Sequence, residues 1–370
     1  MSTRIGIVGM PNAGKSSLFN ALTSAGAEAA NYPFTTIEPN VAVVPVRDER
    51  LELLARVVGA SEVVPDTIDF HDIAGLVGGA HQGEGLGNRF LANIRETDAI
   101  VHVVRAHHDE SVVHPEGSVD PLRDVETVET ELVLADLEQA ERRHERLAKQ
   151  ARGGERAVLA EETWLARVIS ELQAGRPARG VPVPDDAPNA ARDLGSLTAK
   201  PVLYVANVDE GSEELPSGLA EHAAARGASA IAISSRIESE LAELDGDDAA
   251  AMRAELGVSE SGLQRVVAAA FSLLELIAFF TAGEGKPAQS WHMRDGLTAW
   301  RHDGGRRLAP AHRDALRAAC GALGDRRAAA RRPEDAPRPL SDGRRGDPGV
   351  GPPDDRRACR ALHPAAGRGR

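Results

Sequence analysis

The chain has 370 residues and a formal net charge of −13, and 42% of its residues are hydrophobic but only 3% aromatic. This length allows two or three domains and a sizeable core. The sequence contains no apolar run of 18 or more residues and no charged-then-apolar leader, so we expect a soluble, cytoplasmic protein. Its 2 cysteines, Cys320 and Cys359, have neither metal-binding nor redox spacing, which excludes a disulfide framework.

Charge is distributed unevenly along the chain. Residues 1–300 carry 26 Lys and Arg against 47 Asp and Glu, whereas residues 301–370 carry 17 Arg against 9 Asp and Glu. An acidic body argues against a broad electrostatic footprint on nucleic acid, although it allows a local basic patch. We expect a monomer with no DNA partner and no membrane partner.

The strongest motif lies near the N-terminus, where residues 9–16 fit the pattern G-x-x-x-x-G-K-[ST]. The apolar strand Arg4–Val8 precedes it, and Ser17–Leu22 begins a helix. In this setting backbone N–H groups cradle phosphates, Lys15 reaches the β- and γ-phosphates, and the Ser16 hydroxyl binds Mg²⁺. The nucleotide contacts expected from this loop are Gly9, Pro11, Asn12, Ala13, Gly14, Lys15, Ser16 and Ser17, and Lys15 is also expected to act in catalysis.

Further strands are predicted at Thr67–Asp72, which alternates in polarity, and at the apolar runs Ala99–Val104, Pro201–Ala206 and Ala230–Ser234. Strands separated by helical patterns predict a doubly wound α/β sheet of the P-loop NTPase type. We expect one more apolar helix over residues 258–280, packed on this sheet, and a short strand at Gln289–Met293.

A different pattern separates the two halves of the predicted sheet. Val125, Val128 and Leu132 recur at helical spacing in a segment rich in Glu and Arg, and the period returns after Gly153-Gly154. This pattern predicts two long antiparallel helices inserted into the α/β domain. Such a hairpin is either an arm that binds a partner or a solvated helical lid without one.

Two further elements predict the site that senses the γ-phosphate. Asp72 and Gly75 form a D-x-x-G pattern after a strand; Asp72 is expected to hold Mg²⁺ and Gly75 to meet the γ-phosphate. Thr36, with Thr35 as the alternative, is expected to complete the Mg²⁺ ligands Ser16 and Asp72.

The residue expected to assist hydrolysis is His81. Leu76 stands where related GTPases carry a glutamine that orients water, and leucine has no polar group for that task. His81 lies in the Gly-rich segment that follows, so it is expected to act as the catalytic group. Asn12 is a further candidate, as a ligand of K⁺.

The segment Asn207–Glu210 bears on which base is bound. GTPases carry Asn-Lys-x-Asp here, in which the Asp accepts two hydrogen bonds from guanine. This chain lacks the Lys, and Glu210 replaces the Asp. We therefore expect Asn207, Val208, Glu210 and Ser234 to contact a base with ATP preferred over GTP.

Together these motifs resemble the YchF family of Obg-like ATPases within the translation-factor-related GTPases. The resemblance rests on residues 9–16, 31–40, 72–87, 116–121 and 207–210, in that order. It implies a G domain interrupted by a helical coiled-coil domain, a small C-terminal TGS domain, slow hydrolysis of ATP and association with ribosomes. In that family Leu76 corresponds to the hydrophobic replacement of the catalytic Gln, and His81 to the proposed catalytic His.

The chain departs from the family at its C-terminal end. Residues 301–370 contain no Phe, Tyr, Trp or Ile, so they cannot bury much apolar surface. We expect a largely disordered tail, interpreted as non-native sequence from a shifted reading frame, with a basic RNA-binding arm as the alternative. The expected domains are G domain in residues 1–123 and 200–280, helical hairpin in 124–199, an incomplete TGS-like region in 281–300 and the tail in 301–370.

Two other functions remain open at this point. One is a GTPase of the Obg type, which differs in the base that it prefers. The other is a nucleotide-dependent binding protein whose hydrolysis is incidental, which the hydrophobic Leu76 allows. A kinase is disfavoured because the sequence shows no second substrate pocket.

Overall fold

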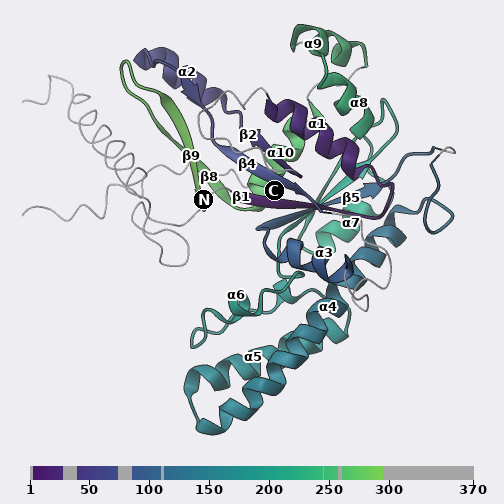
Figure 1. The fold of residues 1–370 in the computed structure, drawn as a ribbon, viewed down its shortest axis with the longest axis vertical. Helices are drawn as coiled ribbons and strands as arrows, with labels where there is room; N and C mark the ends of the chain where they lie inside the picture. The colour runs from purple at the N-terminus through teal and green to yellow at the C-terminus, as the bar shows by residue number, and fades with distance from the viewer. Residues whose placement is uncertain are drawn as a thin grey trace, which may run out of the picture. The chain divides into compact units, whose positions relative to one another are not determined.

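The computed structural model describes residues 3–27, 40–73, 86–109, 112–244, 246–256 and 261–294. Its main element is a six-stranded sheet in the order β2-β4-β1-β5-β6-β7 (Figure 1). These strands are β1 (Thr3–Val8), β2 (Val41–Pro45), β4 (Thr67–Asp72), β5 (Ala99–Arg105), β6 (Val202–Asn207) and β7 (Ser229–Ile233). Only β2 runs antiparallel to its neighbour, and the other neighbouring strands are parallel. The predicted doubly wound sheet is confirmed.

Helices pack on both faces of this sheet, and each face has its own hydrophobic core. Helices α1 (Lys15–Ala27) and α10 (Gly262–Leu273) contribute to one core, which includes Ile5, Phe70 and Val103 of the strands. Helices α3 (Leu86–Arg95), α4 (Pro121–Gln150) and α7 (Leu219–Ala225) contribute to the other, which includes Val8 and Tyr204. Burial of a strand on both faces explains its nearly continuous apolar sequence, because there is no solvent side for polar residues.

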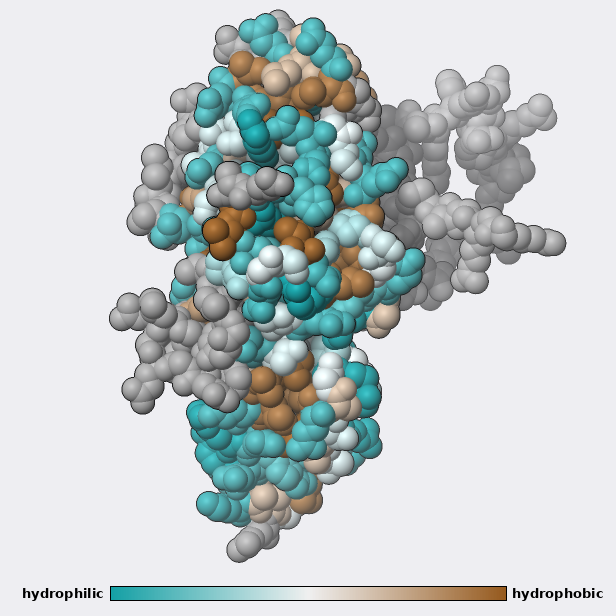
Figure 2. All heavy atoms as spheres, turned by 90° about the vertical axis from the view of Figure 1, so that its right-hand side faces the viewer, coloured by the Kyte–Doolittle hydropathy of each residue, from teal (hydrophilic) through white to brown (hydrophobic). Residues whose placement is uncertain are grey.

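The predicted helical hairpin is present. Helix α4 ends at Gln150, the short 3₁₀ helix η2 (Ala151–Gly153) follows, and α5 (Arg156–Gln173) returns alongside α4. Gly154 has φ 72°, a left-handed conformation that glycine adopts at little cost, so the chain reverses there. Trp164, Leu165 and Val168 of α5 join Ala140 and Leu147 of α4 in an apolar seam. Figure 2 shows a patch of hydrophobic residues among hydrophilic ones in the lower half of the view.

The hairpin continues into the G domain through short elements. These are the 3₁₀ helix η3 (Ala178–Gly180) and helix α6 (Ala190–Leu194), which pack into the same seam. Asp136 of α4 fixes the segment after α6, since its carboxylate accepts hydrogen bonds from the backbone N–H groups of Leu197 and Thr198 at 2.9 and 2.8 Å. On the other side of the sheet, α8 (Ser235–Leu241) and α9 (Gly246–Glu255) form a small apolar cluster.

A second, three-stranded sheet has the order β3-β9-β8 and combines two strands that follow α10 with one that follows α2 (Glu49–Val58). Its strands are β3 (Val63–Val64), β8 (Leu276–Thr281) and β9 (Ala288–Arg294), and helix α2 contributes Leu51 and Ala55 to a cluster with Ala288. The strand predicted at Gln289–Met293 is confirmed as β9.

The predicted helix over residues 258–280 is wrong in its second half. Helix α10 ends at Leu273, and Leu276–Thr281 is a strand. Glu275 between them has φ 52°, which a right-handed helix cannot contain. The residues beyond it include Ile277, Phe279 and Phe280, which favour strands, and pairing with β9 satisfies their backbone groups.

Candidate nucleotide-binding site

The predicted phosphate-binding loop connects β1, near the middle of the sheet, to the first turn of α1. Two positions in the loop require glycine, because a Cβ atom there would clash with neighbouring atoms. A Cβ on Gly9 would lie 2.3 Å from the Val103 carbonyl oxygen, and a Cβ on Gly14 would lie 2.1 Å from Nδ2 of Asn207. Gly14 also has φ 99°, which L side chains rarely adopt. The loop therefore needs glycine at both ends of the motif.

Lys15 lies at the start of α1 and its side chain folds back over the loop. Its Nζ donates a hydrogen bond to the Met10 carbonyl oxygen at 2.9 Å, and the residue is 8% exposed. Burial lowers the pKa of the Lys15 amine, while the nearby carboxylate of Asp72 opposes that shift. A buried cation that bonds to one carbonyl, with a carboxylate nearby, is a site to which a phosphate group can add negative charge.

Asp72 ends β4, the strand beside β1, and so comes next to the loop through the sheet order. Burial raises the pKa of its carboxyl group, and the Lys15 cation acts in the opposite direction. Ser16 and Ser17 are exposed in the first turn of α1. A hydroxyl and a carboxylate are oxygen ligands of the kind that Mg²⁺ prefers.

Asn207 ends β6 and connects the phosphate loop to the loop after β7. Its Nδ2 donates to the Ala13 carbonyl oxygen at 3.1 Å, and its Oδ1 accepts from the backbone N–H of Ser235 at 2.9 Å. The side chain is buried, so both bonds are shielded from water. The sequence predicts that Asn207 contacts the base. The structure adds that its side chain hydrogen-bonds to two loops and so links them.

The segment after β6 carries the remaining residues predicted to contact the base. The N–H of Val208 donates to the Ile233 carbonyl oxygen at 2.9 Å, which holds the segment beside β7. Glu210 is half-exposed and forms an ion pair with Arg236 at 3.2 Å. Arg236 also pairs with Glu240 at 3.2 Å. Ser234 is the N-cap residue of α8 and makes no side-chain capping hydrogen bond.

Asn12 and Arg236 carry contacts that sequence reasoning missed. Asn12 has φ 62°, and its Nδ2 donates to the Val113 carbonyl oxygen at 3.0 Å, so the phosphate loop contacts the segment before α4. The ion pair of Arg236 with Glu210 had one signal in the sequence, since Arg236 lies two residues after Ser234, which is expected near the base.

A buried His–Asp pair fixes the segment contacted by Asn12. His114 Nδ1 accepts from the backbone N–H of Glu116 at 3.1 Å, so Nε2 carries the proton and donates to Asp124 Oδ2 at 2.8 Å. Both side chains are buried. The contact of the phosphate loop is therefore made to a segment that is anchored on α4.

The structure brings together Gly9, Pro11, Asn12, Ala13, Gly14, Lys15, Ser16, Ser17, Asp72, Asn207, Val208, Glu210 and Ser234 at the ends of β1, β4, β6 and β7. Four predicted sites, Thr35 or Thr36, Gly75, Leu76 and His81, lie outside the described residues. In the part of the chain that the structure describes, no helix is long and apolar enough to cross a membrane.

This sheet, with a glycine-bounded phosphate loop between β1 and α1, defines a P-loop nucleoside triphosphatase of the GTPase fold class. In agreement, residues 4–138 match a family model described as "50S ribosome-binding GTPase". The chain is 45% identical over 305 residues to "Ribosome-binding ATPase YchF" of Bacillus subtilis and 48% identical over 302 residues to the protein of that name from Haemophilus influenzae. Each alignment covers 81% of this chain and 83% of the relative.

A solved structure agrees with these sequence comparisons. The YchF GTPase of Schizosaccharomyces pombe matches with a TM-score of 0.70 and 34% identity, over 80% of this chain and 82% of that one. The chain belongs to the YchF family.

Proposed function

We propose that this protein is a nucleotide-switch ATPase that associates with ribosomes and hydrolyses ATP, and GTP less well, to the diphosphate and phosphate. The observation that carries the proposal is the buried Lys15 near Asp72, bonded to a phosphate loop that Asn207 also contacts. Relatives that match four fifths of the chain are named ribosome-binding ATPases, which supports both the nucleotide and the partner.

In this proposal each part of the site has one task. Lys15 exchanges its bond to the Met10 carbonyl for contacts to the phosphates, and Ser16, Thr36 and Asp72 hold Mg²⁺. The ion neutralises charge on the phosphates. Gly75 meets the γ-phosphate, and His81 supplies the polar group that Leu76 cannot. Asn12 uses its amide nitrogen for Val113, which leaves its Oδ1 to ligate K⁺.

The proposed preference for ATP follows from the residues at and after the end of β6, Asn207–Glu210. Adenine offers no N1 proton and no 2-amino group, so a pocket without the aspartate of Asn-Lys-x-Asp loses its main reason to select guanine. Glu210 carries one more methylene than aspartate and pairs with Arg236. Both features weaken a two-bond contact to guanine.

The experiment that tests the proposal is competition of ATP and GTP for the purified protein. We expect ATP to bind at least as well as GTP. Changing Asn207–Glu210 to Asn-Lys-Val-Asp should shift the preference toward GTP by roughly ten- to hundredfold, by analogy with bidentate base contacts worth ~1–3 kcal/mol. A tenfold preference of the parent protein for GTP would contradict the argument and favour the Obg-type GTPase.

The domain assignment is part of the proposal. We assign residues 1–123 and 200–280 to the G domain, 124–199 to an inserted hairpin, and 281–300 to the beginning of a TGS-like region. Residues 301–370 form a tail foreign to the family, and the protein acts as a cytoplasmic monomer. Sedimentation with purified ribosomes, in ATP and in ADP, tests the association and its dependence on the nucleotide.

A further inference from the structure

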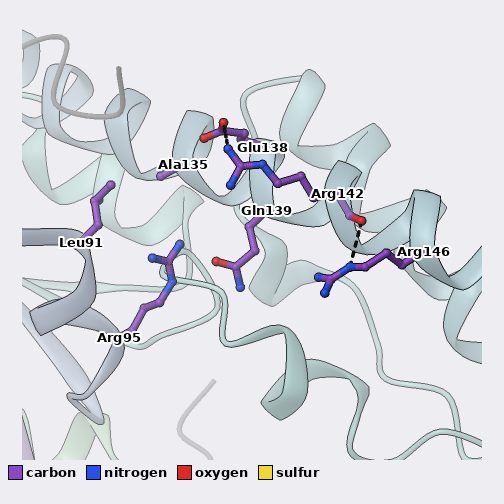
Figure 3. A pocket seen from close by; sticks show the side chains of 7 residues that line it. All are labelled: Leu91, Arg95, Ala135, Glu138, Gln139, Arg142 and Arg146. Carbon is purple, nitrogen blue, oxygen red and sulfur yellow. Dashed lines mark hydrogen bonds and ion pairs between the residues drawn. The ribbon is translucent and has the colours of Figure 1, made fainter. Parts of the chain in front are cut away.

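A pocket of about 210 Å³ lies between α3 and the middle of α4 (Figure 3). Leu91 and Arg95 come from α3, and the other lining residues come from α4. None of them belongs to the phosphate loop or to the segments expected at the base. The volume is below the roughly 300 Å³ at which sites for drug-sized ligands begin, so the pocket suits a group of the size of a phosphate.

The lining carries an excess of positive charge. Three arginines, Arg95, Arg142 and Arg146, face one acidic residue, Glu138. Glu138 is already paired with Arg142, its neighbour one turn along α4. Arg146 uses its Nε for the Arg142 carbonyl oxygen, which leaves its terminal NH₂ groups without a partner among the described residues. Within the described part of the lining, Arg95 and Arg146 thus have no carboxylate of their own, while the charge of Arg95 interacts with that of Asp136 just outside the lining.

Arg95 gives the pocket a buried donor. Its Nε is buried and has no hydrogen-bond partner in the described part of the chain. In Figure 3 its side chain points from α3 toward α4. The nearby carboxylate of Asp136 does not satisfy it, since Asp136 accepts its hydrogen bonds from Leu197 and Thr198. An unsatisfied buried donor costs free energy, and an anion in the pocket would remove that cost.

We propose that this pocket binds a phosphate group of an RNA backbone, with Arg95 and Arg146 as its two donors. The proposal rests on the proposed ribosome association, because ribosomes present RNA phosphates in quantity. Guanidinium groups match phosphate oxygens in geometry and stay charged at every physiological pH.

Exposed basic residues extend from the pocket along one side of α4. Arg142, Arg146 and Lys149 follow one another at spacings of 4 and 3, so they share one side of α4. All three are exposed. Glu145 lies three residues from Arg142 and four from Lys149, so it shares this side of α4, and the excess of positive charge is local to the pocket.

The test is a titration of a fluorescein-labelled 20-nucleotide single-stranded RNA with the full-length protein, followed by anisotropy at several salt concentrations. The variants are Arg95→Gln and Arg146→Gln, and the matched control is Arg56→Gln on the exposed surface of α2. We expect each pocket variant to bind at least roughly tenfold more weakly, the loss typical of one charge-assisted hydrogen bond. A plot of the logarithm of the association constant against that of the salt concentration has a negative slope, and its magnitude should decrease by about 0.7 for each lost phosphate contact.

Three outcomes would overturn the proposal. These are RNA affinity in both pocket variants equal to that of the Arg56→Gln control, no RNA binding by the parent, and binding of inorganic phosphate in the pocket without any RNA effect of the variants. Arg146 is exposed, so its variant decides the matter even where Arg95→Gln fails to fold. Sedimentation with ribosomes is a separate arm: a parent that does not sediment removes the proposed association, while the RNA titration still judges the pocket.

Discussion

His102 is predicted to make the protein sensitive to acid, and the size of the effect follows from its surroundings. It lies on β5 opposite Val8 of β1, and its ring is 5.6 Å from that of Tyr204. The side chain is 2% exposed, and its Nε2 has no partner among the described residues. Burial lowers the pKa of His102 to about 3, with Lys15 and His222 adding to the shift.

The direction of the pH effect on stability follows from the pKa of His102 being higher in the unfolded chain than in the folded protein. The unfolded chain takes up a proton at His102 near pH 6.5, whereas the folded protein does so only near pH 3. Between these values the unfolded state holds one more proton, so the free energy of unfolding falls by about 1.4 kcal/mol per pH unit of acidification. From pH 7.5 to pH 4.5 the loss due to this residue alone is about 3 kcal/mol.

His102→Leu removes the titration and keeps an apolar side chain of similar size in the core. Urea unfolding, followed by circular dichroism between pH 4.5 and 7.5, measures the result. We expect the variant to lose about 3 kcal/mol less stability over this range than the parent. His108→Leu, a change at an exposed histidine, is the control and should keep the acid loss of the parent. Parallel pH profiles for parent and His102→Leu would refute the reasoning.

Three further predictions concern the nucleotide site. Lys15→Ala should abolish triphosphate binding in calorimetry while circular dichroism stays unchanged, because among the described residues Nζ bonds to the Met10 carbonyl of the loop and interacts with the charge of Asp72. Unchanged affinity would contradict the phosphate-loop assignment. Asn207→Ala removes two buried hydrogen bonds and should lower both the nucleotide affinity and the free energy of unfolding, the latter by about 1–3 kcal/mol. An unaffected affinity would show that the hydrogen bonds of Asn207 to the two loops are not needed for nucleotide binding. His81→Ala should lower turnover by ~10²–10⁴-fold and spare ATP affinity, and equal turnover would remove His81 from the site.

The sequence predicted most of the parallel sheet because burial leaves a direct mark on it. Four predicted strands read as apolar runs and Thr67–Asp72 alternates in polarity, and the structure has all five within a residue or two of the predicted bounds. The second half of residues 258–280 was not predictable in the same way. Its residues are apolar in any case, and only the left-handed Glu275 and the pairing of β8 with β9 decide between helix and strand.

The phosphate loop was predictable for a different reason, since its characteristic residue types all lie within one short stretch of sequence. The links between distant segments left no comparable signal. Asn207 meets Ala13, and Asn12 meets Val113, only because the sheet order brings those loops to one edge. A motif search finds the residues of such a site, but their mutual contacts come from the topology.

Glu210 shows how the structure changes the physical basis of a sequence argument. From the sequence, the extra methylene displaces the carboxylate from the position at which it would hold guanine. In the structure, Glu210 also pairs with Arg236, which in turn pairs with Glu240. A guanine would have to compete with that guanidinium for the carboxylate oxygens. Exposed ion pairs contribute only about 0–1 kcal/mol, so the competition weakens guanine binding without abolishing it. A preference for ATP with residual use of GTP is therefore what this arrangement favours.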